Sequence, residues 1–176
     1  MPARVTLALS LIALAVLAAN APAATSKRLD GTAVISFRGV GPIKLGMTLT
    51  QARRAARRTI VAGPEVTRHC RHDRVRPRRL GLATLRFKRH IRVLYVTRRG
   101  LATARGIRVR DTVTRLKSKY GARLVERGSD VSPDTRIFEL RNGRREIQFS
   151  VSRSTGRISQ IATGLRPEVD FSEGCA

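Results

Sequence analysis

The sequence predicts an α+β protein made of two tandem units, each a helix followed by antiparallel β-strands, with the chain tied by a disulfide bond. Three observations lead to this prediction: an internal repeat, a change from helical to strand periodicity within each copy, and a pair of cysteines behind an export signal. The predicted division is a signal peptide at 1–24, an N-terminal segment at 25–38, a first unit at 39–104 and a second unit at 105–176.

The repeat aligns Ile43–Arg53 with Ile107–Lys117, 64 residues further along the chain. Thr48 falls on Thr112, and apolar residues follow each threonine at matching positions. A repeat of this length indicates two copies of one small supersecondary unit.

A helix is predicted at the start of each copy. Thr48 with Gln51 three residues later forms a capping-box pattern. In the second copy Asp111 or Thr112 caps the helix, and Gly121 ends it. Apolar residues recur at helical spacing in both segments, and the arginines of the first segment fall largely on the opposite face.

Strands are predicted after each helix, where apolar and polar residues alternate. They cover Leu82–Phe87 and Ile91–Thr97 in the first unit, and Arg136–Leu140, Glu146–Ser152 and Arg157–Thr163 in the second. Asn142-Gly143 is the strongest hairpin signal in the chain. The segment from Pro64 to Arg79 has two prolines, clustered arginines and no period, so we expect a long loop there.

The first 24 residues have the order of regions typical of a secretory signal peptide. A short positive start precedes the apolar run Val5–Ala19, and small residues follow it. No later stretch is long and apolar enough to span a membrane. We therefore expect a secreted or extracytoplasmic protein, with a retained N-terminal anchor as the alternative.

The chain contains two cysteines, Cys70 and Cys175. Because disulfides form and persist outside the cytoplasm, an even count in an exported chain favours a Cys70–Cys175 disulfide over free thiols. The C-terminal Ser172-Glu-Gly-Cys175 also resembles the Ser-x-Gly-Cys motif of L,D-transpeptidases, which implies a nucleophilic Cys175. The arginine that follows in that family is absent, and no histidine precedes the cysteine nearby, so the disulfide remains the preferred interpretation.

His69, Cys70, His72 and Asp73 form the densest group of potential metal ligands. Nitrogen, sulfur and carboxylate donors so close together could hold zinc or copper. No second cluster supplies further ligands, and His90 is the remaining histidine of the chain. The sequence therefore predicts no metal site and no cofactor.

Basic residues outnumber acidic ones by 36 to 12, which gives a formal net charge of +24. Positions 44–110 hold 20 basic and 2 acidic residues, so the excess lies in the first unit. Such a field attracts polyanions, and the planar arginine guanidinium matches phosphate and carboxylate groups. The candidate anion-binding residues form one patch on the predicted helix and one in the predicted loop: Arg53, Arg54, Arg57, Arg58, Arg71, Arg74, Arg76, Arg78 and Arg79.

The expected partners are an anionic cell-envelope polymer or lipid headgroups, or another protein that contacts an exposed sheet face. Nucleic acid is disfavoured because the chain carries an export signal and because only 4% of its residues are aromatic and available for base stacking. A solvated basic surface without a dedicated ligand is the alternative interpretation of the same charges.

Leu45–Ala52 resembles the helix start of the small exported SmpA/OmlA (BamE-like) domains. The tandem order of helix and strands is similar to the β-lactamase inhibitor protein fold. The pattern from Gly39–Ile43 to Phe171–Cys175 resembles uncharacterised exported proteins of actinobacteria. These resemblances imply the fold and carry over no binding residues, since the second copy has Arg110-Asp111 in place of the glycine and methionine of the motif, and no lipid-attachment cysteine is present.

The predicted function is that of a secreted, non-enzymatic binding protein. No catalytic residues are assigned, because the chain lacks a nucleophile elbow, a phosphate-binding glycine loop and a zinc-protease helix motif. The alternatives are a cell-wall-active enzyme and an inhibitor of an extracellular enzyme.

Overall fold

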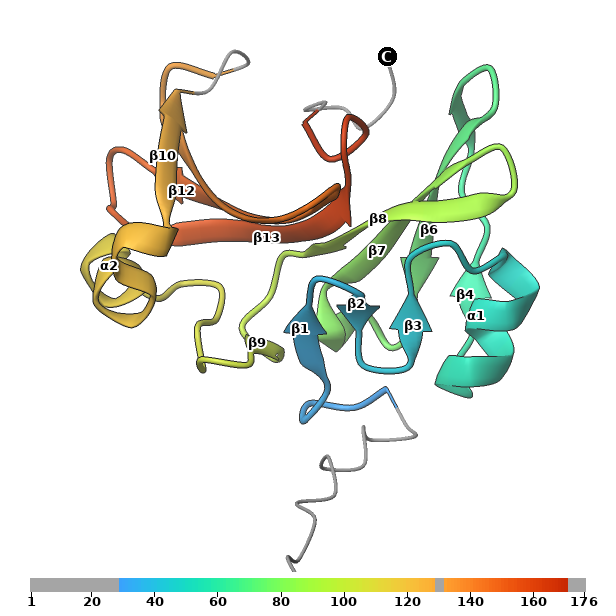
Figure 1. Ribbon diagram of the computed structural model, residues 1–176. Helices are drawn as coiled ribbons and strands as arrows, with labels where there is room; N and C mark the ends of the chain where they lie inside the picture. The colour runs from blue at the N-terminus through green and yellow to red at the C-terminus, as the bar shows by residue number, and fades with distance from the viewer. Residues whose placement is uncertain (1–28, 129–131, 171–176) are drawn as a thin grey trace, which may run out of the picture.

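The computed structural model describes residues 29–128 and 132–170. Within them the chain is built mainly of β-strands, arranged in two sheets with two short α-helices (Figure 1). The signal peptide predicted at 1–24 lies outside the described residues, and so does Cys175.

The larger sheet has nine strands, and all its pairings are antiparallel. Its order is β10-β11-β12-β13-β8-β7-β6-β4, with β5 paired to β6. The strands are β4 (Ile60–Val61), β5 (Glu65–Thr67), β6 (Cys70–Val75), β7 (Leu82–Phe87), β8 (His90–Val96), β10 (Val125–Gly128), β11 (Thr135–Asn142), β12 (Arg145–Ser152) and β13 (Ile158–Leu165).

The smaller sheet has four strands in the order β3-β2-β1-β9. They are β1 (Val34–Ser36), β2 (Gly39–Val40), β3 (Ile43–Lys44) and β9 (Ala102–Thr103). β1 and β9 run parallel, so this sheet joins the N-terminal segment to the connection between the two predicted units.

Both predicted helices are confirmed, and each has eight residues: α1 covers Leu49–Ala56 and α2 covers Val113–Tyr120. Thr48 caps α1 in a complete capping box, in which its hydroxyl accepts from the Gln51 N–H and the Gln51 side chain accepts from the Thr48 N–H. The Thr112 hydroxyl caps α2. Single 3₁₀ turns, η1 (Arg78–Leu80) and η2 (Gly121–Arg123), follow β6 and α2.

The aligned positions of the repeat occupy equivalent places in the fold. Gly46 N–H donates to the Ile91 carbonyl at 2.8 Å, and Arg110 N–H donates to the Ile158 carbonyl at the same distance. Each N-cap threonine then forms an isolated bridge with the residue just before that carbonyl residue, Thr48 with His90 and Thr112 with Arg157. The repeat therefore anchors each helix to one central strand of the larger sheet, α1 to β8 and α2 to β13.

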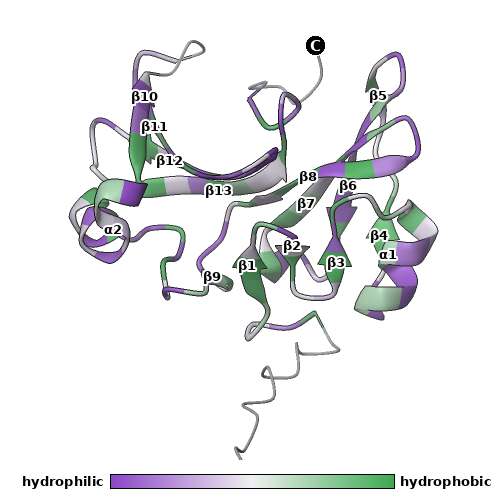
Figure 2. Ribbon diagram, viewed as in Figure 1, coloured by the Kyte–Doolittle hydropathy of each residue, from purple (hydrophilic) through white to green (hydrophobic). Residues whose placement is uncertain are grey.

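The main hydrophobic core lies between one face of the larger sheet and a layer formed by the smaller sheet and the two helices (Figure 1). Ala52 of α1, Leu116 of α2 and Ile35 of β1 meet Phe149 and Leu94 of the larger sheet in this core. In Figure 2 both helices carry hydrophobic and hydrophilic segments side by side, as expected of helices with one buried face.

A second cluster lies on the opposite face of the larger sheet, where the segment after β13 packs (Figure 1). Its members are Cys70, Leu85, Val93, Tyr95, Ala162 and Val169. Gly164 fits directly beneath Val169, because a β-carbon on this glycine would stand 2.8 Å from the Val169 β-carbon. The central strands are thus covered on both faces.

The predicted fold class is wrong: the protein is mostly β, and it is not a pair of helix-plus-strands units of α+β type. Each helix is short, and β8 pairs with β13 over Val93–Val96, so strands from both predicted units merge into one sheet. The predicted Cys70–Cys175 disulfide involves Cys175, which lies outside the described residues, and Cys70 is the single cysteine among them.

The long loop predicted from Pro64 to Arg79 is wrong as well. This segment contains β5, β6 and the turn η1, and β6 pairs with β7 over five residues. A charged residue conceals the strand, because the inward position of β6 is taken by Asp73, which is fully buried. A buried carboxylate breaks the apolar alternation by which a strand is recognised.

The five strands predicted elsewhere are confirmed to within a few residues at their ends. The predicted hairpin forms between β11 and β12, but its turn residues are Gly143 and Arg144, one position later than expected, because Asn142 still pairs with Arg145. Gly143 has a φ of 58°. Across residues 29–128 and 132–170, none of the helices has the length and apolar character needed to cross a bilayer.

Candidate anion-binding site

The fold brings together two arginine clusters that lie about twenty residues apart in sequence. α1 ends because Arg57 adopts a left-handed conformation with φ of 47°, and the chain turns back as β4. β4 pairs antiparallel to β6, and Arg76 N–H donates to the Thr59 carbonyl at 2.9 Å. The residues just before β4 therefore lie beside those just after β6.

An arginine-lined pocket of about 450 Å³ forms at this junction. Its lining residues are Arg57, Arg58, Thr59, Arg76, Pro77 and Arg78. Four of the nine predicted anion-binding residues thus face one cavity: Arg57 and Arg58 follow α1 directly, Arg76 follows β6, and Arg78 begins η1.

Two further pockets adjoin the first. One, of about 430 Å³, is lined by Arg74, Val75, Arg78, Gly81, Leu82, Ala83, Thr97 and Arg98. The other, of about 190 Å³, is lined by Leu29, Asp30, Gly31, Arg58, Pro77, Arg79, Leu80 and Gly100. Together these three pockets are called the arginine groove below.

The positive charge of the arginine groove has almost no negative charge beside it. Among the described residues, seven arginines and one acidic residue, Asp30, line it. Throughout the part of the chain that the structure describes, no aspartate or glutamate forms an ion pair within 4.0 Å of these seven side chains. Six of them are exposed, and the Arg58 guanidinium donates to the Leu29 carbonyl at 3.2 Å. Guanidinium groups that are exposed and form no ion pair can donate two parallel hydrogen bonds to one phosphate or carboxylate.

The other predicted arginines have different roles. Arg53 clamps the turn after α1, since its Nε and Nη2 atoms donate to the Ile60 carbonyl at 2.8 and 2.6 Å. Arg71 pairs with Glu65 at 3.0 Å on the β5–β6 hairpin, and exposed Arg54 lines none of the three pockets. Arg98 was not predicted; its signal was its position two residues after β8, which ends at Val96.

Gly81 leaves room for the Arg98 side chain, which lines the arginine groove. Its φ is 59°, and a β-carbon here would stand 2.6 Å from the Arg98 β- and γ-carbons. We expect Gly81→Ala to destabilise the fold by about 1–3 kcal/mol, through left-handed strain and displacement of Arg98, and to weaken anion binding. Urea unfolding and phosphate titration measure the two effects.

Gly106→Ala is the matched control for this substitution, because Gly106 has a φ of 77° and open space around its missing β-carbon. It should cost stability through backbone strain alone and leave phosphate binding unchanged. Equal losses in the two variants would show that contact with Arg98 contributes nothing.

The histidine–cysteine group does not converge into a ligand set. The His72 ring stacks on Tyr95 with ring centroids 6.0 Å apart, and Cys70 is buried in the second hydrophobic cluster. The Asp73 carboxylate is engaged by Arg86, Thr84 and the backbone of Gly63. Its oxygens are therefore committed to neighbours within the sheet.

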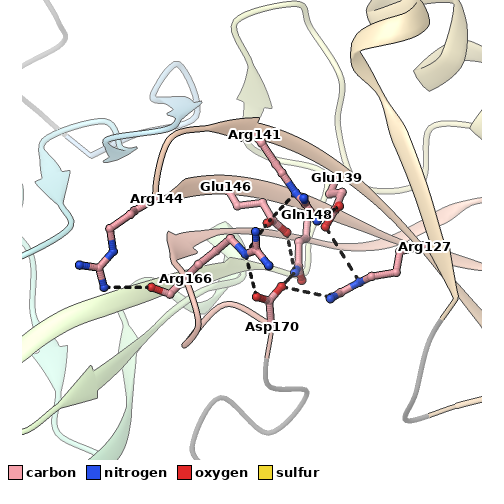
Figure 3. A network of polar contacts seen from close by, with 8 residues as sticks. All are labelled: Arg127, Glu139, Arg141, Arg144, Glu146, Gln148, Arg166 and Asp170. Carbon is pink, nitrogen blue, oxygen red and sulfur yellow. Dashed lines mark hydrogen bonds and ion pairs between the residues drawn. The ribbon is translucent and has the colours of Figure 1, made fainter.

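Sequence reasoning missed a carboxylate centre on the opposite half of the larger sheet (Figure 3). Glu139 of β11, Glu146 of β12 and Asp170 place one oxygen each within 4.8 Å of one another. Both glutamates are buried, and Gln148 donates to Glu146 at 2.7 Å and to Asp170 at 3.2 Å. No motif could reveal the centre, because its members come from three separate segments.

Three arginines surround this carboxylate centre (Figure 3). Arg127 lies 3.2 Å from Asp170, Arg166 lies 3.0 Å from Asp170 and 3.6 Å from Glu146, and Arg141 contacts Glu139. The guanidinium groups already supply positive charge next to the carboxylates. The arrangement therefore suits a network that attaches the segment after β13 to the sheet better than it suits a metal site.

Burial raises the pKa of Glu146 to about 7. The hydrogen bond from Gln148 opposes this rise, and the nearby Glu139 and Asp170 carboxylates add to it. Glu146 therefore takes up a proton at a higher pH than an ordinary glutamate does.

No protein-family model matches the chain, and none of the curated proteins matches it. Among solved structures, the chain is similar to an extracellular protein containing a SCP domain from Bacillus anthracis str. Ames, with a TM-score of 0.52 and 9% identity. The similarity covers 69% of this chain and 44% of that protein, so the chain spans less than half of its length. It is also similar to the uncharacterized protein yfeY from Escherichia coli, with a TM-score of 0.49 and 16% identity over 76% of this chain and 99% of that one.

At 9% identity, the similarity to the Bacillus anthracis protein shows a shared fold and gives no information on the function of this chain. It is extracellular by its description, and neither description names an enzymatic activity. The resemblance to the SmpA/OmlA and β-lactamase inhibitor folds remains a prediction.

Proposed function

We propose that the protein is a non-enzymatic binding protein of the cell envelope that holds an anionic ligand in the arginine groove. The observation that carries this proposal is that Arg57 and Arg58 meet Arg76 and Arg78 around one pocket, where none of the described carboxylates forms an ion pair with them. Elsewhere in the described chain, buried carboxylates of the sheet have arginine partners, as Asp73 and Glu139 do. The groove thus stands out as charge left for an external partner.

The physical basis is electrostatic relief. Guanidinium groups gathered at one surface repel one another, and an anion bound among them removes this repulsion while forming charge-assisted hydrogen bonds. An anion that binds only the folded state also stabilises it by mass action. Inorganic phosphate should therefore raise the unfolding temperature of the purified protein more than chloride does at equal ionic strength.

We expect the triple variant Arg57→Gln, Arg76→Gln and Arg78→Gln to lose this phosphate-specific stabilisation. It should also bind a polyglycerol phosphate polymer about 10-fold or more weakly, with a salt dependence that flattens by about one unit per lost phosphate contact. Calorimetric titration at several salt concentrations measures both quantities.

The matched control replaces Arg123, Arg145 and Arg153 by glutamine. These three arginines are exposed, line none of the three pockets and belong to the other half of the protein. The control removes the same net charge, so binding that falls equally in both triple variants would show a general basic surface and refute a dedicated groove.

A further inference from the structure

The arginine groove is continuous around the turn η1. Arg78 lines both of the larger pockets, and Arg58 and Pro77 line both the first and the smallest pocket. The three cavities are therefore neighbours along one path. That path begins near Leu29, passes the end of α1 and reaches the beginning of β7 at Leu82.

The size of the path exceeds what one anionic group can fill. The two larger pockets measure about 450 and 430 Å³, and each lies in the range of roughly 300–1,000 Å³ that accommodates a whole small-molecule ligand. Arginines stand along the entire length: Arg79 and Arg58 at one end, Arg57, Arg76 and Arg78 in the middle, and Arg74 and Arg98 at the other. Charge repeated along a path matches charge repeated along a chain.

The uncharged residues that line the groove indicate that its ligand has no aromatic groups. They are threonine, proline, glycine, alanine, valine and leucine, and none of the described residues that line the three pockets is aromatic. Proteins that bind single-stranded nucleic acid stack its bases on aromatic rings, which the described lining does not offer. Recognition in the groove thus depends on the anionic backbone of the ligand.

A membrane surface is a poorer match than a polymer. Interfacial binding draws on buried apolar area as well as charge. The exposed large apolar residues of the described chain are Val34, Val61, Val66, Phe87 and Val125, and none of them lines the groove. A headgroup held in a recessed pocket would also leave the remaining arginines of the path unused.

We propose that the groove binds one linear polyanion with repeating phosphate groups and no aromatic moiety, and that it engages at least two phosphates of the same chain at once. This inference rests on the proposed function, that the groove binds anions. Arg78 is the residue that makes the two larger pockets act together, because it contributes to both.

The length of the ligand should then decide its affinity. When one phosphate is bound, the next is held at a high effective concentration, and linked sites of this kind gain about 10²–10⁴-fold over separate ones. Orthophosphate, tripolyphosphate and long-chain inorganic polyphosphate serve as the probes, titrated into the purified protein at one fixed ionic strength. We expect the long chain to bind at least about 100-fold more tightly than orthophosphate.

The variant Arg78→Gln tests the coupling between the pockets. It should lose most of the gain with chain length and bind orthophosphate nearly as well as the original protein, because Arg57, Arg58 and Arg76 still line the first pocket. Arg145→Gln, which removes an exposed arginine outside the groove, should keep the full gain.

The outcomes separate this inference from the proposed function. If orthophosphate stabilises the protein through Arg57 and Arg76 but affinity does not rise with chain length, the groove binds single anions and the polymer inference is overturned. If none of the probes binds, both proposals fail. Tighter binding of a single-stranded oligonucleotide with the same number of phosphates, or of phosphatidylglycerol vesicles at the same phosphate concentration, would overturn the assignment to a non-aromatic polymer.

Discussion

Replacing Asp73 by alanine is expected to lower the free energy of unfolding by about 3–5 kcal/mol, the loss typical of breaking a buried ion pair from one side. The Asp73 side chain is fully buried in β6, and its partner, the Arg86 side chain, is 12% exposed. The Arg86 Nη2 atom donates to Asp73 at 2.9 Å, and the Thr84 hydroxyl and Gly63 N–H donate to the same carboxylate at 3.2 Å. The substitution leaves all these donors without their acceptor.

Equilibrium urea unfolding measures this loss. Asp73→Asn keeps the shape and one acceptor, so it should lose less stability and remain measurable if the alanine variant does not fold. The double variant Asp73→Leu, Arg86→Met replaces both charges with apolar groups and should recover part of the loss. A cost below about 1 kcal/mol for Asp73→Ala would show that the pair does not stabilise the sheet.

The protein is expected to become less stable as the pH rises from about 4.5 to 7, because of Glu146 in the carboxylate centre. Its pKa in the folded state is raised to about 7 from an ordinary value of 4.5. A raised pKa means that the folded state holds the proton more tightly than the unfolded state does. The resulting stabilisation is complete below the ordinary pKa and is lost as the pH passes through the folded pKa, a change of about 3 kcal/mol at roughly 1.4 kcal/mol per pH unit.

The variant Glu146→Gln removes the titrating group. Unfolding by urea at about pH 5 and about pH 8 should show a smaller pH dependence in this variant than in the original protein, by about 3 kcal/mol. The groups that face Glu146 are Glu139, Asp170, Arg141, Arg166 and Gln148, and all of them remain.

Glu126→Gln provides the comparison for this test. Glu126 is exposed, and its hydrogen bond from Arg136 lowers its pKa, so its titration lies below the tested window. This variant should keep the original pH dependence. If Glu146→Gln leaves the pH dependence intact as well, Glu146 is not the group that holds the extra proton.

The sequence predicted local structure well where a single short pattern determines it. The N-caps at Thr48 and Thr112 were confirmed, and so was the hairpin signalled by Asn142-Gly143, although its turn lies one residue later. Each of these features depends on hydrogen bonds or backbone angles within a few residues. The repeat was also informative, since its aligned residues attach α1 and α2 to equivalent strands. It gave no information on how those two strands pair with each other.

The predicted fold class was wrong because the pairing between the two units could not be predicted. Pairing of β8 with β13 joins residues far apart in sequence, and the smaller sheet is built from strands of two or three residues, too short to show a period. Likewise, the arginines of the groove were mostly predicted from their density, whereas their division into pocket-lining and structural residues was not. Arg53 and Arg57 have similar sequence surroundings. The turn after α1 gives them different roles, because Arg53 donates to the Ile60 carbonyl and Arg57 lines the pocket.

Charges are paired unequally in the two halves of the larger sheet, so the positive field is stronger on the side of the groove. In the half that contains β11 and β12, Arg127, Arg141 and Arg166 pair with carboxylates, whereas the groove beside β6 and η1 presents seven arginines without an ion pair among the described residues. A polyanion that diffuses toward the protein therefore exerts a torque that turns the groove toward it before contact. A larger share of collisions then becomes productive, and salt reduces this advantage by shortening the range of the field.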